Sequence, residues 1–227
     1  MSCGVAIFVK TPSLSPVKTR LWPGLGRPRA QALYLAAAGA VASVAEAAQR
    51  DGCVQAYWAV AEDVRLTADA WRGLPQLPQG HGSLGERMAQ VYRLLRRQHR
   101  GAVLIGADTP QLVAAALERA GHWLQSDEPR LVIGRATDGG FWLFGGNAEL
   151  PESAWLEPRY STAATADEFV AAMQGHGRWL QLETLRDIDT VDDLPHVRTH
   201  LAALAAPTQA QRQLLAWMET VNDRPPP

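Results

Sequence analysis

Aspartates stand shortly after three apolar segments of this 227-residue chain. Asp108 follows one such segment, Asp138 follows the next, and Asp187 and Asp189 follow another near the end of the chain. Carboxylate oxygens are the ligands of hard divalent cations such as Mg²⁺, which binds one or two carboxylates together with substrate phosphates. The four aspartates are therefore candidates for a metal site that acts on a phosphorylated substrate.

The cations that would complete such a site follow the first apolar segment. Lys10, Lys18 and Arg20 share that loop, and the first two are the only lysines among 22 basic residues. The ammonium of lysine is a compact point charge, whereas the guanidinium of arginine is planar and forked. Because all other basic residues are arginine, the two lysines in this loop indicate a need for ammonium groups here. Positive charges beside a metal would stabilise phosphate oxygens in a transition state. The alternative explanation is that the two lysines fall in one loop by chance.

Apolar strands alternate with helical segments, which predicts an α/β open sheet, mainly parallel and flanked by helices. The segment 4–9 is continuously apolar and rich in β-branched residues, as in a strand that is buried on both faces. In such sheets, ligands bind beyond the carboxyl ends of the strands, where the candidate residues stand. The expected strands are 4–9, 53–60, 102–107, 131–136, 141–144 and 179–185, with a short one within 73–82, and the expected helices are 28–50, 62–71, 84–98, 110–124, one from 165, one after 190 and 208–221.

Several of the expected helices begin at recognisable capping residues. Ser83 and Glu86 have the spacing of a capping box, in which each side chain binds a free amide of the other residue. Thr109 is the expected N-cap of the helix that ends near residue 124. Thr190 is the expected N-cap of the helix that begins just after residue 190. These caps fix where the loops that carry the aspartates end.

Each aspartate also has a structural explanation, because aspartate is common in turns and near helix N-termini. For Asp108 this explanation is weak, since Thr109 already supplies the cap, and we expect a functional role. For Asp187 and Asp193, a position near the start of a helix is a sufficient explanation. Lys18, as a residue of a mobile surface loop, is expected to contribute less than about 0.5 kcal/mol to the free energy of unfolding.

Composition narrows the functional classes. Apolar residues make up 47% and charged residues 20% of the chain, as in a globular protein, and the net charge is −1. This balance argues against a protein dedicated to nucleic acids or membrane surfaces, which would carry a basic excess. Cys3 and Cys53 form no disulfide framework, and the first apolar run is too short for a signal peptide, so we expect a cytoplasmic protein. P-loop and dinucleotide-binding motifs are missing from the sequence.

Six short motifs occur in an order that is typical of one bacterial family. They are FVKTP at 8–12, VKTRL at 17–21, LGERM at 84–88, IGADTP at 105–110, DGG at 138–140 and DIDT at 187–190. Together they resemble the DUF2064 proteins, also called "transferase 1, rSAM/selenodomain-associated", within the nucleotide-diphospho-sugar transferase (GT-A) superfamily. The resemblance spans residues 4–200 and leaves the last helix outside it.

The resemblance implies a Rossmann-like, mainly parallel sheet of seven strands with a nucleotide site at its first half. In nucleotidyltransferase relatives the first loop holds the nucleotide phosphates, and Mg²⁺ or Mn²⁺ is the cofactor. Lys18, Arg20 and Asp108 would be the catalytic groups. The implied binding residues are Lys10, Lys18, Arg20, Gly82, Leu84 and Gly85 for the nucleotide, Asp108 and Asp189 for the metal, and Asp138, Gly139 and Gly140 for the acceptor.

Three functions remain open on these grounds. The leading expectation is Mg²⁺-dependent nucleotidyl transfer from a nucleoside triphosphate to a small phosphorylated or acidic acceptor. The alternative is glycosyl transfer from a nucleotide-diphospho-sugar, and the third is a non-catalytic nucleotide-binding module, which would not need the metal carboxylates. The expected partners are a nucleotide and a small-molecule acceptor, without nucleic acid or membrane, and a homodimer is compatible with the sequence.

No internal repeat or low-complexity segment divides the chain. We expect one transferase-like domain over residues 1–206. A C-terminal helix over 207–221 should pack on or beside this domain, and a flexible tail should follow over 222–227.

Overall fold

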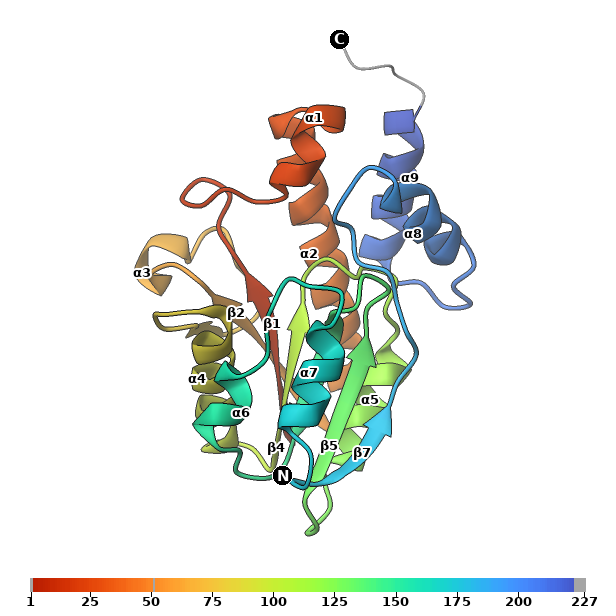
Figure 1. Cartoon of the computed structure of the whole chain (residues 1–227). Coiled ribbons are helices and arrows are strands. Elements are labelled where there is room, and N and C mark those ends of the chain that lie inside the picture. Colours follow the sequence, from red (N-terminus) through yellow and green to blue (C-terminus); the bar gives the residue numbers. More distant parts are fainter. Residues whose placement is uncertain (1, 51, 223–227) are drawn as a thin grey trace.

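A seven-stranded sheet forms the centre of the protein (Figure 1). The computed structural model describes residues 2–50 and 52–222. The strands are β1 (Cys3–Val9), β2 (Val54–Val60), β3 (Gln76–Pro78), β4 (Gly101–Gly106), β5 (Arg130–Arg135), β6 (Phe141–Gly146) and β7 (Arg178–Gln181). Their order is β3-β2-β1-β4-β6-β5-β7, and β6 runs antiparallel to its neighbours β4 and β5, whereas the other pairs are parallel. This confirms the predicted α/β fold with a mixed, mainly parallel sheet.

Both faces of the sheet are covered, which explains the uninterrupted apolar sequence of β1. Alternate side chains of a strand point to opposite faces. Val5 and Ile7 belong to the apolar core on one face, and Ala6 belongs to the core on the other. Every position of this strand therefore needs an apolar or small residue, and each is buried except Phe8, which is partly exposed.

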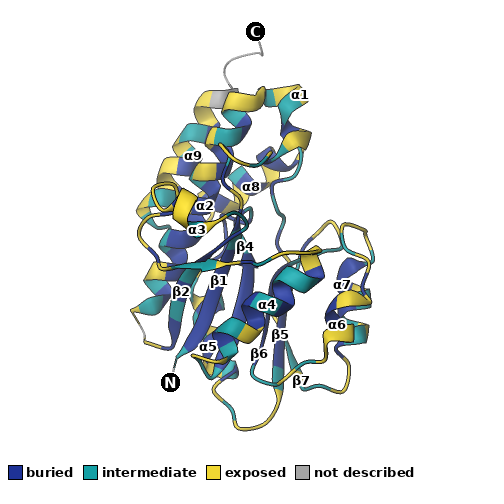
Figure 2. Cartoon of the chain, turned by 90° about the vertical axis from the view of Figure 1, so that its left-hand side faces the viewer, coloured by how far each residue is buried: buried dark blue, intermediate teal, exposed yellow. Residues whose placement is uncertain are grey.

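Helices cover the sheet in two layers, and Figure 2 shows the strands buried between them. The helices are η1 (Thr19–Leu21, a 3-10 helix), α1 (Trp22–Leu25), α2 (Arg27–Gln49), α3 (Val64–Thr67), α4 (Leu84–Arg96), α5 (Ala114–Trp123), α6 (Glu152–Leu156), α7 (Thr165–Ala172), α8 (Asp193–Ala202) and α9 (Gln209–Asn222). The core on one face contains α2 and α5, and the core on the other contains α4, α6 and α7. A third apolar cluster joins η1, the first half of α2, α8 and α9.

α2 lies between the sheet and α9, and its many alanines allow close approach on both sides. Ala38 and Ala45 pack toward the sheet, whereas Ala37 and Ala40 pack in the cluster with α8 and α9. By length and composition α2 could also cross a membrane, but 56% of its most apolar window is buried within the protein, as in a core helix. The predicted C-terminal helix is α9, and of the predicted tail, residues 223–227 lie outside the described residues.

The largest difference from the predicted elements is at the start of α5. Thr109 is the predicted N-cap, but the helix begins only at Ala114. The intervening loop is bound by α9 instead, because Gln211 Nε2 donates to the carbonyl oxygens of Pro110 at 2.8 Å and Leu112 at 2.9 Å. A buried carbonyl needs a hydrogen-bond partner, and here a side chain from a distant helix provides it in place of a helical turn. The prediction of Thr109 as a cap is therefore wrong.

Two other predicted caps have different outcomes. The capping box is confirmed, since Ser83 Oγ accepts from the amide of Glu86 at 3.3 Å and the Glu86 carboxylate accepts from the amide of Ser83 at 2.6 Å. Thr190 does not cap α8; instead the carboxylate of Asp193 accepts from the amide of Thr190 at 2.8 Å and from its hydroxyl at 3.0 Å. Asp193 thus has the structural role that its position predicts. The predicted elements over 62–71 and 179–185 are shorter than expected and form α3 and β7.

Candidate functional site

The loop after β4 and the segment after β7 meet at the carboxyl edge of the sheet. The amide of Ile188 donates to the carbonyl of Asp108 at 2.9 Å and joins the two segments. Ile188 is buried in the third apolar cluster. Because side chains alternate along an extended segment, this burial turns Asp187 and Asp189 to the other side, toward Asp108. We call Asp108, Asp187 and Asp189 the acidic trio.

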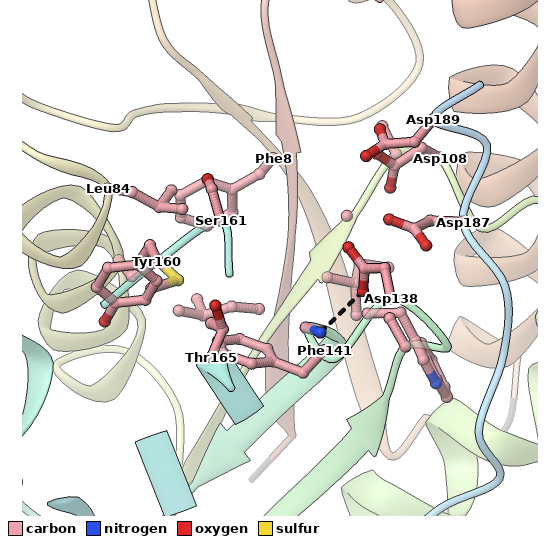
Figure 3. A pocket seen from close by; sticks show the side chains of 18 of the residues that line it. Phe8, Leu84, Asp108, Asp138, Phe141, Tyr160, Ser161, Thr165, Asp187 and Asp189 are labelled. Atoms are coloured by element: carbon pink, nitrogen blue, oxygen red, sulfur yellow. Dashed lines mark hydrogen bonds between the residues drawn. The ribbon is translucent and has the colours of Figure 1, made fainter. Parts of the chain in front are cut away.

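The acidic trio could hold a metal ion. One carboxylate oxygen from each residue lies within 4.8 Å of the others, so a single cation could contact all three. Figure 3 shows the three side chains converging at one end of a cavity. The structure therefore brings together Asp108 and Asp189, although 81 residues separate them in the sequence.

Lys18 is inserted between two of these carboxylates. Its Nζ donates to Asp108 Oδ2 at 2.8 Å and to Asp189 Oδ1 at 3.1 Å, and its side chain is 10% exposed. Burial alone would lower the pKa of Lys18, but the two carboxylates outweigh burial and hold this pKa above its ordinary value. Lys18 is thus a largely buried and charged partner of the acidic trio, whereas the sequence suggested a mobile surface residue.

The other two predicted cations lie differently. Arg20 Nη1 donates to Asp189 Oδ2 at 3.1 Å from the solvent side, where the arginine side chain is 68% exposed. Arg20 sits in η1, which the buried Leu21 anchors to the core. Lys10 is exposed, and the ion pairs of the described residues join only Lys18 and Arg20, not Lys10, to the trio. The first loop therefore brings Lys18 and Arg20, but not Lys10, to the acidic trio.

Asp187 does not lie near the start of a helix, as the sequence suggested. It belongs to the acidic trio, whereas α8 begins six residues later, at Asp193. Burial raises the pKa of Asp187 to about 7, and the charges of Asp108, Asp138 and Asp189 add to the rise. The Asp-Ile-Asp spacing, with an apolar residue between two acids, is the signal that could have identified it.

The pH dependence of stability is expected to report on Asp187. The folded-state pKa of about 7 lies above the unfolded value of about 3.9, so the folded protein binds the extra proton between these limits. The contribution of this proton to the free energy of unfolding is complete below about pH 4 and is lost as the pH rises to about 7. Asp187→Asn should remove this component, which thermal unfolding of both proteins from pH 4 to pH 8 measures. Parallel pH profiles for the two proteins would contradict the assignment.

A cavity of about 370 Å³ adjoins the acidic trio. Of the predicted acceptor and nucleotide residues, Asp138, Gly140 and Leu84 line it. Asp138 Oδ1 accepts from the amide of Gly140 at 2.8 Å, which fixes the carboxylate against its own turn (Figure 3). Four further lining residues, from the segment between α6 and α7 and from the start of α7, were not predicted as site residues. These are Tyr160, Ser161, Thr162 and Thr165.

The remaining predicted glycines, Gly82, Gly85 and Gly139, are not among the described lining residues. Gly85 lies so close to the carbonyl of Trp155 that a Cβ would overlap it. Gly139 has φ +91°, and a Cβ there would overlap the backbone of Ala163. Gly85 and Gly139 need glycine because the backbone of another segment packs directly on them.

Gly139→Ala is expected to lower the free energy of unfolding by at least about 2 kcal/mol, since it combines an unfavourable φ with a backbone overlap. Gly175→Ala is the matched control, because Gly175 has φ +84° but no atom within 4 Å of the place that a Cβ would take. The control should lose only about 1 kcal/mol, the contribution of φ alone. Chemical denaturation of both variants measures the difference, and equal losses would show that the Ala163 contact is unimportant.

The sequence of the chain is similar to one family profile. The profile described as "Uncharacterized protein conserved in bacteria (DUF2064)" matches residues 41–162. The comparison with curated proteins gives no match.

Solved structures share the fold. A protein of Desulfovibrio desulfuricans G20, provisionally described as a nucleotide-diphospho-sugar transferase, has a TM-score of 0.84 at 24% identity over 97% of both chains. A nucleotidyl transferase of Methanothermobacter thermautotrophicus has a TM-score of 0.56 at 13% identity over 88% of this chain and 97% of that one. The 4-diphosphocytidyl-2C-methyl-D-erythritol synthase of Anaerococcus prevotii DSM 20548 has a TM-score of 0.52 at 9% identity over 88% and 96%. At these identities the likeness shows the fold alone.

Proposed function

The chain belongs to the DUF2064 family, whose profile matches more than half of it, and we propose that it is a metal-dependent transferase that uses a nucleotide substrate. One observation carries this proposal: Lys18 meets Asp108 and Asp189 at the carboxyl edge of the sheet. Sheets of this class bind ligands at that edge. The combination of carboxylates and cations there suits a metal-bound phosphate chain.

The acidic trio fits a hard divalent cation. It offers carboxylate oxygens alone, without imidazole or thiolate, and such ligands suit Mg²⁺ or Mn²⁺. The pKa of Asp187 is raised first by burial and then by the charges of Asp108, Asp138 and Asp189, which a bound cation would offset. When bound there, the cation would neutralise phosphate oxygens and stabilise the charge of the transition state. Asp187 thus joins Asp108 and Asp189 as a proposed ligand.

Lys18 and Arg20 are the proposed phosphate-binding residues. Both contact Asp189, so they are the positive charges next to the trio. Ammonium and guanidinium groups form strong, charge-assisted hydrogen bonds with phosphate oxygens. The two residues would hold the phosphates of the nucleotide and stabilise the group that leaves.

Nucleotidyl transfer is the form of the reaction that we place first. An acceptor oxygen forms a bond to the α-phosphorus of a nucleoside triphosphate. The bond from that phosphorus to the oxygen of the β-phosphate breaks, and its electron pair leaves with pyrophosphate. If the attacking group is a hydroxyl, its proton passes to Asp138, the carboxylate of the cavity wall that lies outside the trio.

Glycosyl transfer from a nucleotide-diphospho-sugar is the second candidate. The observation that favours it is the negative charge of the cavity, where Asp138 lies beside the trio. A neutral sugar acceptor would tolerate these carboxylates better than an anionic one. In this case the acceptor hydroxyl oxygen bonds to the sugar carbon, and its proton passes to Asp138. The bond from that carbon to the diphosphate oxygen breaks, and its electron pair leaves with the nucleoside diphosphate.

A thermal-stability screen with nucleoside triphosphates and nucleotide sugars, with and without Mg²⁺, tests the proposal. A ligand at 100 times its dissociation constant should add about 2.7 kcal/mol to the free energy of unfolding. Stabilisation by a triphosphate favours nucleotidyl transfer, and release of pyrophosphate checks it. Stabilisation by a nucleotide sugar favours glycosyl transfer, which release of a nucleoside diphosphate checks. Absence of a Mg²⁺-dependent shift with any nucleotide at millimolar concentration would contradict the proposal.

A further inference from the structure

The cavity beside the acidic trio has two chemically different sides (Figure 3). Asp138 joins the trio on one side, so four carboxylates face the space there. The opposite side consists of aromatic, aliphatic and hydroxyl side chains from β1, α4 and the segment between α6 and α7. Among these residues are Phe8, Leu84, Tyr160 and Ser161.

Positive charge is missing from this cavity, since none of the described residues that line it is lysine, arginine or histidine. The four arginines adjacent in sequence to lining residues are engaged elsewhere: Arg87 binds Gln79, Arg135 pairs with Asp167, Arg159 pairs with Glu168 and Arg186 pairs with Asp193. Lys18 and Arg20, the cations beside the trio, are already bound to its carboxylates. An anionic molecule in the cavity would meet negative charge without a protein counter-charge, whereas an uncharged molecule would not.

Ser161 gives the uncharged side a hydrogen-bonding group. Its backbone is left-handed, with φ 63°, a conformation that is strained for a residue other than glycine. The hydroxyl of Thr165, its neighbour in the cavity, donates to the carbonyl oxygens of Arg159 and Thr162. The exposed hydroxyl of Ser161 has no hydrogen-bond partner within the described part of the chain, so it is available to a ligand.

We infer that the acceptor is an uncharged molecule that combines hydroxyl groups with an apolar ring or chain. The inference rests on the proposed transferase function and differs from the phosphorylated or acidic acceptor expected from the sequence. The hydroxyl groups bind Asp138 and Ser161, since both are hydrogen-bonding groups of the wall. The apolar part lies against Phe8, Leu84 and Tyr160.

Two matched pairs of probes test the inference. One pair is phenyl β-D-glucopyranoside and its 6-phosphate, and the other is benzyl alcohol and benzyl phosphate. Calorimetric titration and saturation-transfer NMR measure their binding to the full chain in the presence of Mg²⁺. We expect the uncharged member of each pair to bind at least about tenfold more tightly, and its aromatic protons to receive the strongest saturation.

Variants at Ser161 locate the binding site of the probes. Ser161→Arg places a positive charge on the wall and should raise the affinity for the phosphorylated members by about tenfold or more. Ser153→Arg is the matched control, because it adds the same charge at an exposed position of α6 that does not line the cavity. Ser161→Gly removes the hydroxyl and relieves the backbone strain, so it should weaken the uncharged probes about threefold without lowering Tm.

Equal or tighter binding of the phosphorylated members to the wild type overturns the inference. Failure of both uncharged probes to bind at millimolar concentration overturns it too, as does an equal response to Ser161→Arg and Ser153→Arg. Nucleotide binding in the same preparation separates this inference from the proposed function. If Mg²⁺-dependent stabilisation by a nucleotide persists while the probes fail, the acceptor class alone is wrong. If that stabilisation is also missing, the transferase proposal fails.

Discussion

Asp108→Asn is expected to abolish divalent-cation binding at the acidic trio and to lower transferase activity at least about 100-fold. Loss of a group that is only hydrogen-bonded to a metal ligand lowers metal affinity or activity about 10- to 100-fold. Loss of the ligand itself should lower them by at least as much. The substitution preserves shape, and Lys18 keeps its ion pair with Asp189, so the fold should persist. Calorimetric titration with Mg²⁺ and turnover of the nucleotide identified by the stability screen measure the two effects.

Asp192→Asn is the matched control for this substitution. It makes the same chemical change at an exposed residue just after the trio. Asp192 is the N-cap of α8 without a side-chain capping bond, and asparagine is as good an N-cap as aspartate. The control should retain both activity and cation binding. Unchanged cation affinity in Asp108→Asn would remove Asp108 from the metal site, and equal losses in both variants would point to a general effect of charge.

Lys18→Ala is expected to change cation binding and nucleotide binding in opposite directions. The ammonium occupies oxygens of Asp108 and Asp189 that a divalent cation would use, so its removal should raise the Mg²⁺ affinity measured without nucleotide. The same change deletes a charge-assisted phosphate contact of about 1.5–3 kcal/mol, so nucleotide affinity should fall roughly tenfold to more than a hundredfold. Calorimetry with each ligand separately distinguishes the two effects.

Stability should also respond to Lys18→Ala, and more than expected for a loop lysine. The substitution leaves two carboxylates without their counter-charge, but these are 31% and 34% exposed and remain partly solvated. We therefore expect a loss of about 1–2 kcal/mol in the free energy of unfolding, between the values for exposed and buried pairs. Chemical denaturation measures this loss.

Lys18→Arg is the charge-conserving control. The ammonium fits between two carboxylates as a compact point charge, whereas the guanidinium is longer and planar. The variant should keep the stability contribution of a positive charge but regain only part of the nucleotide affinity and activity. Unchanged nucleotide affinity in Lys18→Ala would remove Lys18 from the phosphate site. Full activity in Lys18→Arg would make the concentration of lysines in the first loop a matter of chance.

Much of the site could be predicted because its residues follow strands. Asp108 follows β4 and Lys18 lies in the loop after β1, and the carboxyl ends of parallel strands meet at one edge of a sheet. Asp189 was predicted from its motif and also reaches this edge. Asp187 was explained by a nearby helix start because its position beside Asp189 depends on Ile188, whose burial in a cluster with α8 and α9 turns both acids to the same side.

The wall of the cavity could not be predicted in the same way. Ser161 and its neighbours lie in the segment between α6 and α7, which carries no motif and follows no strand directly. They reach the cavity because this segment packs against the turn after β5, where the carbonyl of Gly139 accepts from the amide of Ala166 at 2.8 Å. Such a contact joins segments whose local patterns are independent of each other.

By itself the sequence determined the α/β class, the main strands and the loops that carry the charges, because continuous apolar runs must be buried in a covered sheet. Only the tertiary structure decided which groups become partners. Lys18 binds carboxylates that are 90 and 171 residues away, and Gln211 of α9 binds the loop that local capping signals predicted to be helical. The physical reason is that ion pairs, hydrogen bonds and shared burial depend on distances between segments, and these distances are set when the layers pack together.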